Sequence, residues 1–176
     1  MDFTISDEVK SVQQLAAQIM GDFTEVDKLK AVEQQDDVFD EKLWGALAEA
    51  GLLGLDIAEN QGGMDLGFFA LTVLCEEVGR TVAQVPVVPV LVGAAATLRR
   101  YGSDSQKDQW LPGIASGSTI VTSALEEYNN DDPAKPGCTA QPVEGGYALS
   151  GVKICVNQAH TAARILVSAH NGEELV

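Results

Sequence analysis

The sequence predicts an α+β protein in which an all-α domain comes first and a partial antiparallel β-domain follows. Apolar residues recur at helical spacing through the first part of the chain, between recognisable helix caps. From Ser118 the pattern changes to short β-branched runs separated by polar, glycine-containing turns. Because helices and strands are segregated along the chain, we expect a helical domain over 1–117 and a β-domain over 118–176.

The helical part is expected to begin with a helix over residues 6–23. Ser6 can cap this helix, and acidic residues follow in the first turn, where the helix dipole favours them. The charged stretch 24–38 is expected to be a loop or a frayed continuation. Asp40 then caps a second helix that runs to Ala50.

Both ends of this second helix carry further signals. Phe39 and Trp44 occupy the positions of a hydrophobic staple, and Gly51 is a natural left-handed terminator. In the loop that follows, Gly62 and Gly63 are expected to supply unusual backbone angles.

Three more helices are expected before the β-domain. The first, over 66–83, has a wide apolar surface and should be buried. The proline-rich segment 85–89 breaks it, and the next helix covers 90–101 and ends at Gly102. Ser103 or Asp104 caps the last helix, which is expected to end at Leu111, before Pro112.

The β-domain is expected to contain a strand over 119–125, a hairpin formed by 139–143 and 147–156, and a further strand over 163–169. A polar loop over 129–137 connects the first strand to the hairpin. The last strand is apolar and would leave an open edge, and such edges are normally paired or covered. We therefore expect an oligomer, or completion by further chain or a partner.

Charge and composition exclude several classes of function. Eleven basic and 26 acidic residues give a net charge of −15, which disfavours nucleic acid and anionic membranes as partners. No apolar run is long enough to cross a membrane, and the N-terminus does not resemble a secretory signal. Three widely spaced cysteines are typical of a reduced, cytoplasmic protein. Two histidines, His160 and His170, are too few for a zinc site, so no metal is expected.

No self-standing catalytic motif is present, and no catalytic residue is predicted. The acidic cluster of Asp36, Asp37, Asp40 and Glu41 lacks the spacing of a calcium loop and is interpreted as a solvated loop. Glu76 or Glu77 is expected to pair with Arg80 on the apolar helix, as an ordinary helix pair.

Several segments occur together in an order typical of one family. They are LWGALAEAGLLGL (43–55), the glycine pair at 62–63, CEEVGR (75–80), YGSDSQKDQWLPGIASG (101–117) and GGYALSGVK (145–153). In this order and spacing, the chain resembles the N-terminal helical domain and part of the middle β-domain of the acyl-CoA dehydrogenases.

The resemblance implies an activity and a cofactor. Acyl-CoA dehydrogenases use FAD to remove two hydrogens across the α,β bond of an acyl-CoA thioester. A carboxylate of the family's C-terminal helical domain takes the α-proton, and the flavin accepts the β-hydride. The chain ends before that region, so we expect the isolated chain to be inactive. The resemblance leaves the acyl group open: straight-chain, branched and steroid side-chain thioesters all agree with it.

Two segments depart from the family's flavin contacts. The first strand of the family usually reads Ala-Leu/Met-Thr-Glu-Pro before a Gly-Ser-Asp turn, with the threonine on the flavin. Here Ala124, Leu125 and Glu127 agree, whereas Glu126 replaces the threonine and Tyr128 the proline. An unpaired carboxylate at Glu126 would oppose the anionic reduced flavin.

The second segment, 151–159, reads GVKICVNQA, where the family usually has G-x-K-x-W-I-S/T-N-A/G. Lys153 agrees, and Cys155 replaces the tryptophan that lies against the flavin. Asn157 keeps hydrogen-bonding capacity where the hydroxyl would be. By this resemblance, Leu125 and Asn157 are the predicted cofactor-binding residues.

Three interpretations follow from the departures. The chain is a divergent subunit that has lost a complete flavin site within a heteromeric enzyme, a homomeric enzyme that holds FAD through other contacts, or a non-catalytic structural partner or interaction module. A yellow purified chain would favour the second. The predicted partners are an acyl-CoA substrate and a second dehydrogenase subunit, in a homo- or hetero-oligomer.

Overall fold

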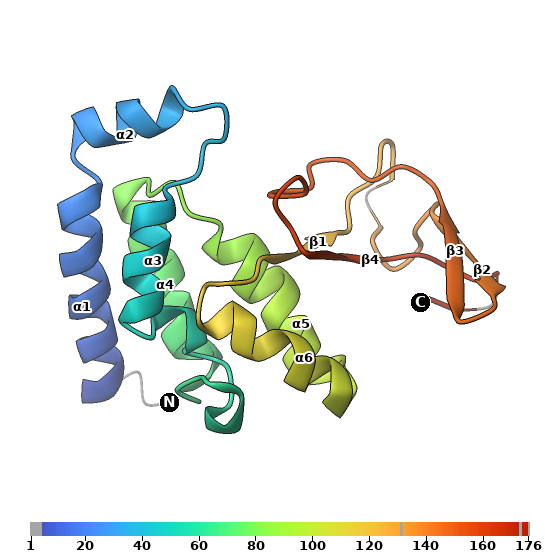
Figure 1. Ribbon diagram of the computed structural model, residues 1–176, viewed down its shortest axis with the longest axis horizontal. Coiled ribbons are helices and arrows are strands. Elements are labelled where there is room, and N and C mark those ends of the chain that lie inside the picture. Colours follow the sequence, from blue (N-terminus) through green and yellow to red (C-terminus); the bar gives the residue numbers. More distant parts are fainter. Residues whose placement is uncertain (1–4, 131, 173, 176) are drawn as a thin grey trace. The chain divides into compact units, whose positions relative to one another are not determined.

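A computed structural model describes residues 5–130, 132–172 and 174–175 of the chain. The chain divides into two compact units, Met1–Ile120 and Val121–Val176, here called the helical unit and the β unit (Figure 1). Each unit is described by itself. The expected order of a helical region followed by strands is confirmed.

The helical unit begins with α1 (Asp7–Phe23), and the Ser6 hydroxyl accepts a hydrogen bond from Val9 N as expected for its cap. The next helix, α2 (Val26–Glu33), lies in the stretch that was expected to be a loop, so that prediction was wrong. Glu25 makes no side-chain capping bond, and Val32 is the only buried residue of α2. The sequence therefore lacked both a cap and a clear apolar face at this helix.

The second predicted helix is α3 (Glu41–Glu49), and its expected ends are confirmed. The Asp40 carboxylate accepts from Lys42 N and Leu43 N, at 3.1 and 3.0 Å. The rings of Phe39 and Trp44 meet edge to face with centroids 6.1 Å apart, which is the expected staple. Gly51 follows in the left-handed conformation, with φ of 75°.

Two single 3₁₀ turns, η1 (Leu52–Gly54) and η2 (Glu59–Gln61), form the connection to α4. Gly62 has the expected left-handed backbone, with φ of 82°. Gly63 is required for a different reason, because a Cβ there would lie 2.0 Å from the Ile57 carbonyl oxygen. The pair therefore combines one unusual angle with one close backbone approach.

The apolar helix α4 (Gly67–Thr81) has five buried residues, among them Leu71, Leu74 and Glu77. A π-helical segment, η3 (Val88–Ala95), then continues directly into α5 (Ala96–Tyr101). This helix begins two residues earlier than predicted, because Pro89 occupies its first turn, where a missing N–H costs no hydrogen bond.

The last helix, α6 (Asp104–Ala115), starts with a capping box between Ser103 and Gln106. It continues through Pro112, so the predicted end at Leu111 was wrong. The last turn is closed from Ser116 N to the Pro112 carbonyl. Beyond it, the Trp44 indole N–H donates to the Gly117 carbonyl oxygen at 3.0 Å, which fastens the exit of α6 to α3.

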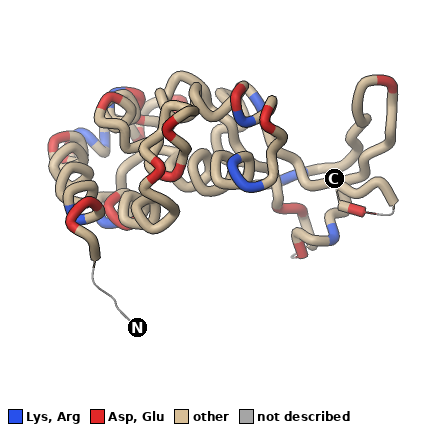
Figure 2. The backbone as a smooth tube through the Cα atoms, turned by 90° about the horizontal axis from the view of Figure 1, so that it is seen from below, with Lys and Arg blue, Asp and Glu red and all other residues tan. Residues whose placement is uncertain are grey.

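The core of the helical unit is apolar. Helix α1 packs against α3 and α4, and α6 packs against α5, η1 and η2. Its fully buried large side chains include Met20, Leu43, Leu47, Leu71, Leu74, Leu111 and Ile114. Figure 2 shows Asp and Glu positions on many elements of the chain. Among the described residues, no helix combines the length and apolarity needed to span a bilayer.

The β unit contains two pairs of strands. The predicted hairpin is present: β2 (Thr139–Val143) and β3 (Gly146–Ser150) pair antiparallel around Glu144 and Gly145. Its second strand was predicted to run to 156 but ends at Ser150, so its predicted length was wrong. In contrast, β1 (Val121–Ala124) and β4 (Arg164–Val167) pair in parallel, so the expectation of a wholly antiparallel domain was wrong. The chain returns to β1 by a crossover that includes the hairpin, instead of folding back at a turn.

Candidate surface at the end of strand β1

Two segments of the β unit that are distant in sequence lie side by side. Leu125 to Tyr128 follow β1, and Ile154 belongs to the segment after the hairpin. The Ile154 N–H donates to the Glu126 carbonyl oxygen at 3.0 Å. These are the two segments in which the sequence predicted cofactor contacts, and the fold brings them together.

Glu127 is the centre of this junction. Its carboxylate accepts from Lys153 Nζ at 2.8 Å, Asn130 Nδ2 at 2.9 Å, Cys138 N at 2.9 Å and Gly137 N. These donors, led by the Lys153 ammonium, lower the pKa of Glu127 to about 2. The carboxylate is therefore ionised across the physiological range, and it fastens the loop 130–138 as well as Lys153.

Lys153 connects a third segment to the junction. Its ammonium also donates to Ser168 Oγ at 2.9 Å, and Ser168 comes directly after β4. The side chains of Glu127 and Lys153 are each 8% exposed, so this is a buried ion pair. Both members are among the residues at which these two segments agree with the family pattern.

Three of the residues that differ from the family pattern are exposed. Glu126, Tyr128 and Cys155 all face solvent, and Tyr128 is 77% exposed. Cys155 also has a left-handed backbone, with φ of 53°, a conformation that disfavours a bulky ring. The substitution at this position is therefore matched by a backbone that suits a small side chain better than tryptophan.

The two predicted cofactor-binding residues lie on the same pair of segments. Leu125 is 47% exposed, directly after β1, and Asn157 is exposed in the turn that follows Cys155. Both side chains are accessible to a ligand. The adjacent Gln158 is buried and bonds instead to the Thr161 hydroxyl, at 2.7 Å.

Sequence reasoning missed two residues of this junction. Asn130 donates both to Glu127 and to the Lys135 carbonyl oxygen, and so closes the loop that stands in place of the family's Gly-Ser-Asp turn. The preceding Asn129 is left-handed, with φ of 60°, which asparagine tolerates well. The asparagine pair was therefore a readable turn signal. Ser168 carried no signal, because only the parallel pairing of β4 with β1 brings it to Lys153.

Among the described residues of the helical unit, two carboxylates are buried. Glu77 pairs with Arg80 on α4, as predicted, with Arg80 Nη2 to Glu77 Oε2 at 2.6 Å. Asp56 pairs with Arg99 at 2.9 Å, and Arg99 also reaches Asp65 at 3.4 Å. Burial raises the pKa of Asp56 despite the nearby guanidinium.

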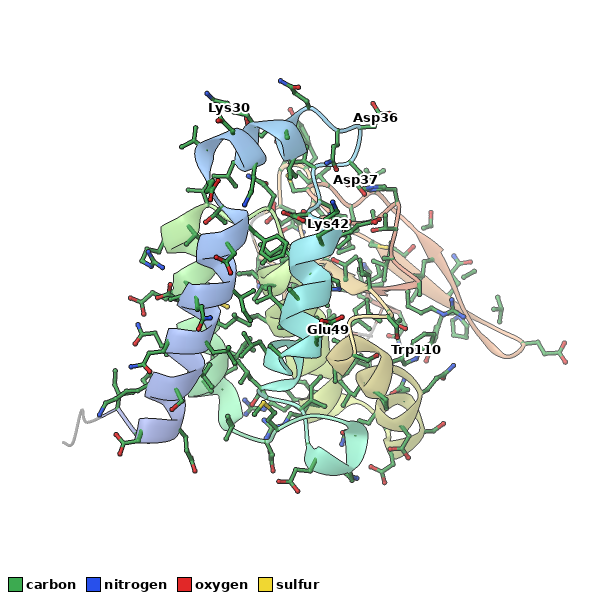
Figure 3. The ribbon with its side chains drawn as sticks, turned by 60° about the vertical axis from the view of Figure 1, so that its left-hand side comes forward. Lys30, Asp36, Asp37, Lys42, Glu49 and Trp110 are labelled. Carbon is green, nitrogen blue, oxygen red and sulfur yellow. The ribbon has the colours of Figure 1, made fainter. Side chains whose placement is uncertain are left out.

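A cavity of about 590 Å³ lies in the helical unit, beside α2. Figure 3 shows Lys30 and Asp36 on α2 and the turn after it, and Lys42 on α3. Residues that line the cavity include Asp22, Lys28, Val32, Asp37, Phe39 and Lys42. Lys28 is engaged with the Asp22 carbonyl oxygen at 2.6 Å, and the Asp40 carboxylate caps α3. The wall has both charge signs and defines no ligand chemistry.

The chain thus consists of a helical unit followed by a β unit, in which an ion pair joins the segments after β1 and β3. The profile of the acyl-CoA dehydrogenase N-terminal domain matches residues 6–118. The chain belongs to the acyl-CoA dehydrogenase family.

Relatives in this family cover almost the whole chain. A variant of the Tcur3481–Tcur3483 steroid ACAD is 45% identical, with a TM-score of 0.91, and covers 98% of this chain and 47% of that chain. The ChsE4–ChsE5 complex from Mycobacterium tuberculosis is 26% identical, with a TM-score of 0.90, over 99% of this chain and 47% of that chain.

Curated relatives give the same picture. The acyl-CoA dehydrogenase FadE27 of Mycobacterium tuberculosis is 28% identical over 169 residues, which are 96% of this chain and 44% of that protein. The chain thus spans somewhat less than half the length of the relatives it matches.

Proposed function

We propose that this chain is part of one subunit of an FAD-dependent acyl-CoA dehydrogenase assembled from two unlike subunits. The observation that carries the proposal is the 45% identity to the Tcur3481–Tcur3483 steroid ACAD over nearly the whole chain. That protein and the ChsE4–ChsE5 complex are each named as a pair of components. The same likeness supports a steroid acyl-CoA thioester as substrate, ahead of straight-chain and short branched ones.

In this proposal the flavin surface of the β unit is incomplete. The family threonine is replaced by the exposed carboxylate of Glu126, and the tryptophan by Cys155 on a left-handed backbone. A carboxylate beside the flavin opposes the charge that develops on reduction. Loss of one ring contact removes stabilisation of about 1 kcal/mol. Two side chains that the family uses to contact FAD are therefore replaced on this surface.

The roles of this chain's residues follow from that incomplete surface. Leu125 and Asn157 stay the proposed cofactor contacts, one apolar and one able to hydrogen-bond. We assign no catalytic base in this chain. FAD in the assembled enzyme would supply the hydride acceptor, and this chain would support the assembly around it.

The absorbance spectrum of the purified chain tests the proposal. We expect no flavin absorbance after gel filtration of the chain alone, and a yellow complex when it is co-expressed with a dehydrogenase subunit. Stoichiometric FAD on the chain alone would favour the alternative of a homomeric enzyme that holds FAD through backbone and other side-chain contacts. If neither the chain nor a complex binds acyl-CoA, a non-catalytic interaction module is the better interpretation.

Turnover provides a second test. General-base catalysis is typically worth about 10²–10⁴-fold in rate, so a chain without the base should show none above background. We expect no dye-coupled oxidation of steroid or straight-chain acyl-CoA by the chain alone. Oxidation by the chain alone would mean that a base has been overlooked.

A further inference from the structure

We propose that Glu127 and Lys153 are positioning residues that hold the two segments of the cofactor surface, 125–128 and 153–157, in one fixed arrangement. The inference deepens the proposed function and rests on it, because the surface concerned is the one assigned to the cofactor.

The first support is the connectivity of the pair. A single ammonium group contacts Glu127 Oε1 at 2.8 Å and Ser168 Oγ at 2.9 Å, so it joins the segments after β1, β3 and β4. The backbone bond from Ile154 N to the Glu126 carbonyl lies directly beside it, at 3.0 Å. One side-chain pair and one adjacent backbone bond thus set the distance between the two segments.

The second support is the alternation of buried and exposed residues around the pair. The side chains of Glu127 and Lys153 are each 8% exposed, whereas Glu126, Leu125 and Cys155 face solvent. The pair therefore lies under the surface and cannot itself offer a large area to a ligand. Any effect that it has on ligand binding acts through the exposed neighbours.

The third support is the different anchoring of the two partners. The Glu127 carboxylate is also held by the amides of Gly137 and Cys138 and by Asn130, so it stays in place when Lys153 is removed. Removal of one partner leaves the other charge buried without its counter-ion, which is strongly unfavourable. We therefore expect Lys153→Met to release the segment 153–157, while the ladder between β2 and β3 persists.

The natural thiol of Cys155 allows a direct test on the full chain. Cys138 is buried, so a nitroxide attached in a C75S background reports on Cys155. We expect K153M to increase the mobile fraction of this label about twofold or more, and K153R to restore it. The matched control is K135M, because Lys135 is an 85% exposed lysine of the same unit that pairs loosely with Asp132.

A second label separates positioning from general stability. In a C75S/C155S background, a nitroxide at Y147C reports on the hairpin, where Tyr147 is exposed. K153M should leave this label unchanged. If K153M loosens both labels equally, or if it leaves the Cys155 label as in the parent chain, the positioning role is wrong.

FAD titration on the same variants separates this inference from the proposed function. If the parent chain binds FAD measurably, K153M should weaken its affinity about tenfold while K153R and K135M do not. FAD affinity that is unchanged in K153M would overturn the positioning role. Tight FAD binding by the parent chain would contradict the proposal that the flavin surface is incomplete, but it would not contradict the positioning role. The mobility of the Cys155 label would still decide whether Glu127 and Lys153 hold the two segments in place.

Discussion

The helical unit and the β unit each contain a nearly buried carboxylate beside a cation, and the pKa values of the two carboxyls are shifted in opposite directions. Asp56 and Glu127 are 7% and 8% exposed, and each has a cation within 3 Å. Burial raises the pKa of Asp56, whereas hydrogen bonds lower that of Glu127 to about 2. Glu127 accepts from four donors, including two backbone amides, so its charge is solvated by the protein.

The two units also differ in the interactions that stabilise them. The helical unit buries a large set of leucines, and its ion pairs lie at the margin of that core. The β unit has a small apolar cluster, formed by Cys138, Ala140 and Ala169 with Val167 packed against it. We infer that the helical unit depends on apolar packing, whereas the segments 125–128 and 153–157 of the β unit depend more on the ion pair of Glu127 with Lys153.

The largest effect should come from Leu74→Ala in the helical unit. Leu74 is fully buried on α4, and truncation of a buried leucine typically costs about 2–5 kcal/mol. Urea unfolding followed by fluorescence of Trp44 and Trp110, which both lie in this unit, measures the change. Leu15→Ala, at a site that is 40% exposed, is the control and should cost clearly less. Equal losses of unfolding free energy in the two variants would contradict the inference that apolar packing stabilises the helical unit.

Glu127→Gln should change the acid stability of the β unit. The carboxylate has a pKa of about 2 when folded and 4.5 when unperturbed, so its contribution is complete above pH 4.5 and is lost as the pH falls towards 2. The variant should be less stable than the parent chain at pH 7. It should also lack the further loss of stability that the parent chain shows between pH 4.5 and 2. Amide signals of residues 125–128 and 153–157, followed against pH, measure this loss.

The matched control for this titration is Glu144→Gln, at the exposed hairpin turn. This variant should keep the loss between pH 4.5 and 2. The raised pKa of Asp56 has the opposite sign, since protonation on acidification favours the folded helical unit. If both units lose stability over the same pH range by the same amount, the contrast between the two carboxylates is wrong.

Trp44→Phe should cost about 1–3 kcal/mol, because it keeps most of the ring but leaves the Gly117 carbonyl without its donor. This change tests whether neutral hydrogen bonds at the margin of the helical core matter less than its packing. Trp110 fluorescence reports the unfolding. The expected loss does not depend on pH, whereas that of Glu127→Gln shrinks as the pH falls from 4.5 towards 2. A pH-dependent loss for Trp44→Phe would argue against this explanation.

Ser103→Ala should have the smallest effect, about 1 kcal/mol, through loss of the α6 capping box. Ser105→Ala, in the exposed first turn of the same helix, is the control and should be nearly neutral. Thermal unfolding of the two variants makes the comparison. Equal stability of both would show that the cap contributes nothing measurable.

Elements with local signals were predictable from the sequence. Ser6, Asp40, Ser103 and Gly51 mark helix ends through bonds within a few residues, and all four occur as predicted. The short helix α2 was missed because it has no side-chain cap and buries one valine. For a helix this short, local propensity alone does not decide whether it forms.

The candidate surface was predictable only in part. Family resemblance pointed to the segments around Leu125 and Asn157, and the fold places those segments together. The ion pair of Glu127 with Lys153 and the bond to Ser168 were not predictable, because they depend on β4 pairing in parallel with β1. Contacts of this kind are set by topology and not by local sequence.

The parallel pairing of β1 with β4 has a kinetic consequence. Val121 pairs with Arg164, so about 40 residues must be synthesised and folded back before the pair can close. Helices and the β2–β3 hairpin need only contacts between near neighbours in the chain, and such contacts form fastest. We therefore expect a newly made chain to acquire its helices first, its hairpin next and its β1–β4 pair last. Until that step, the unpaired edge of β1 is the part of the nascent chain most exposed to chaperones and to misassembly.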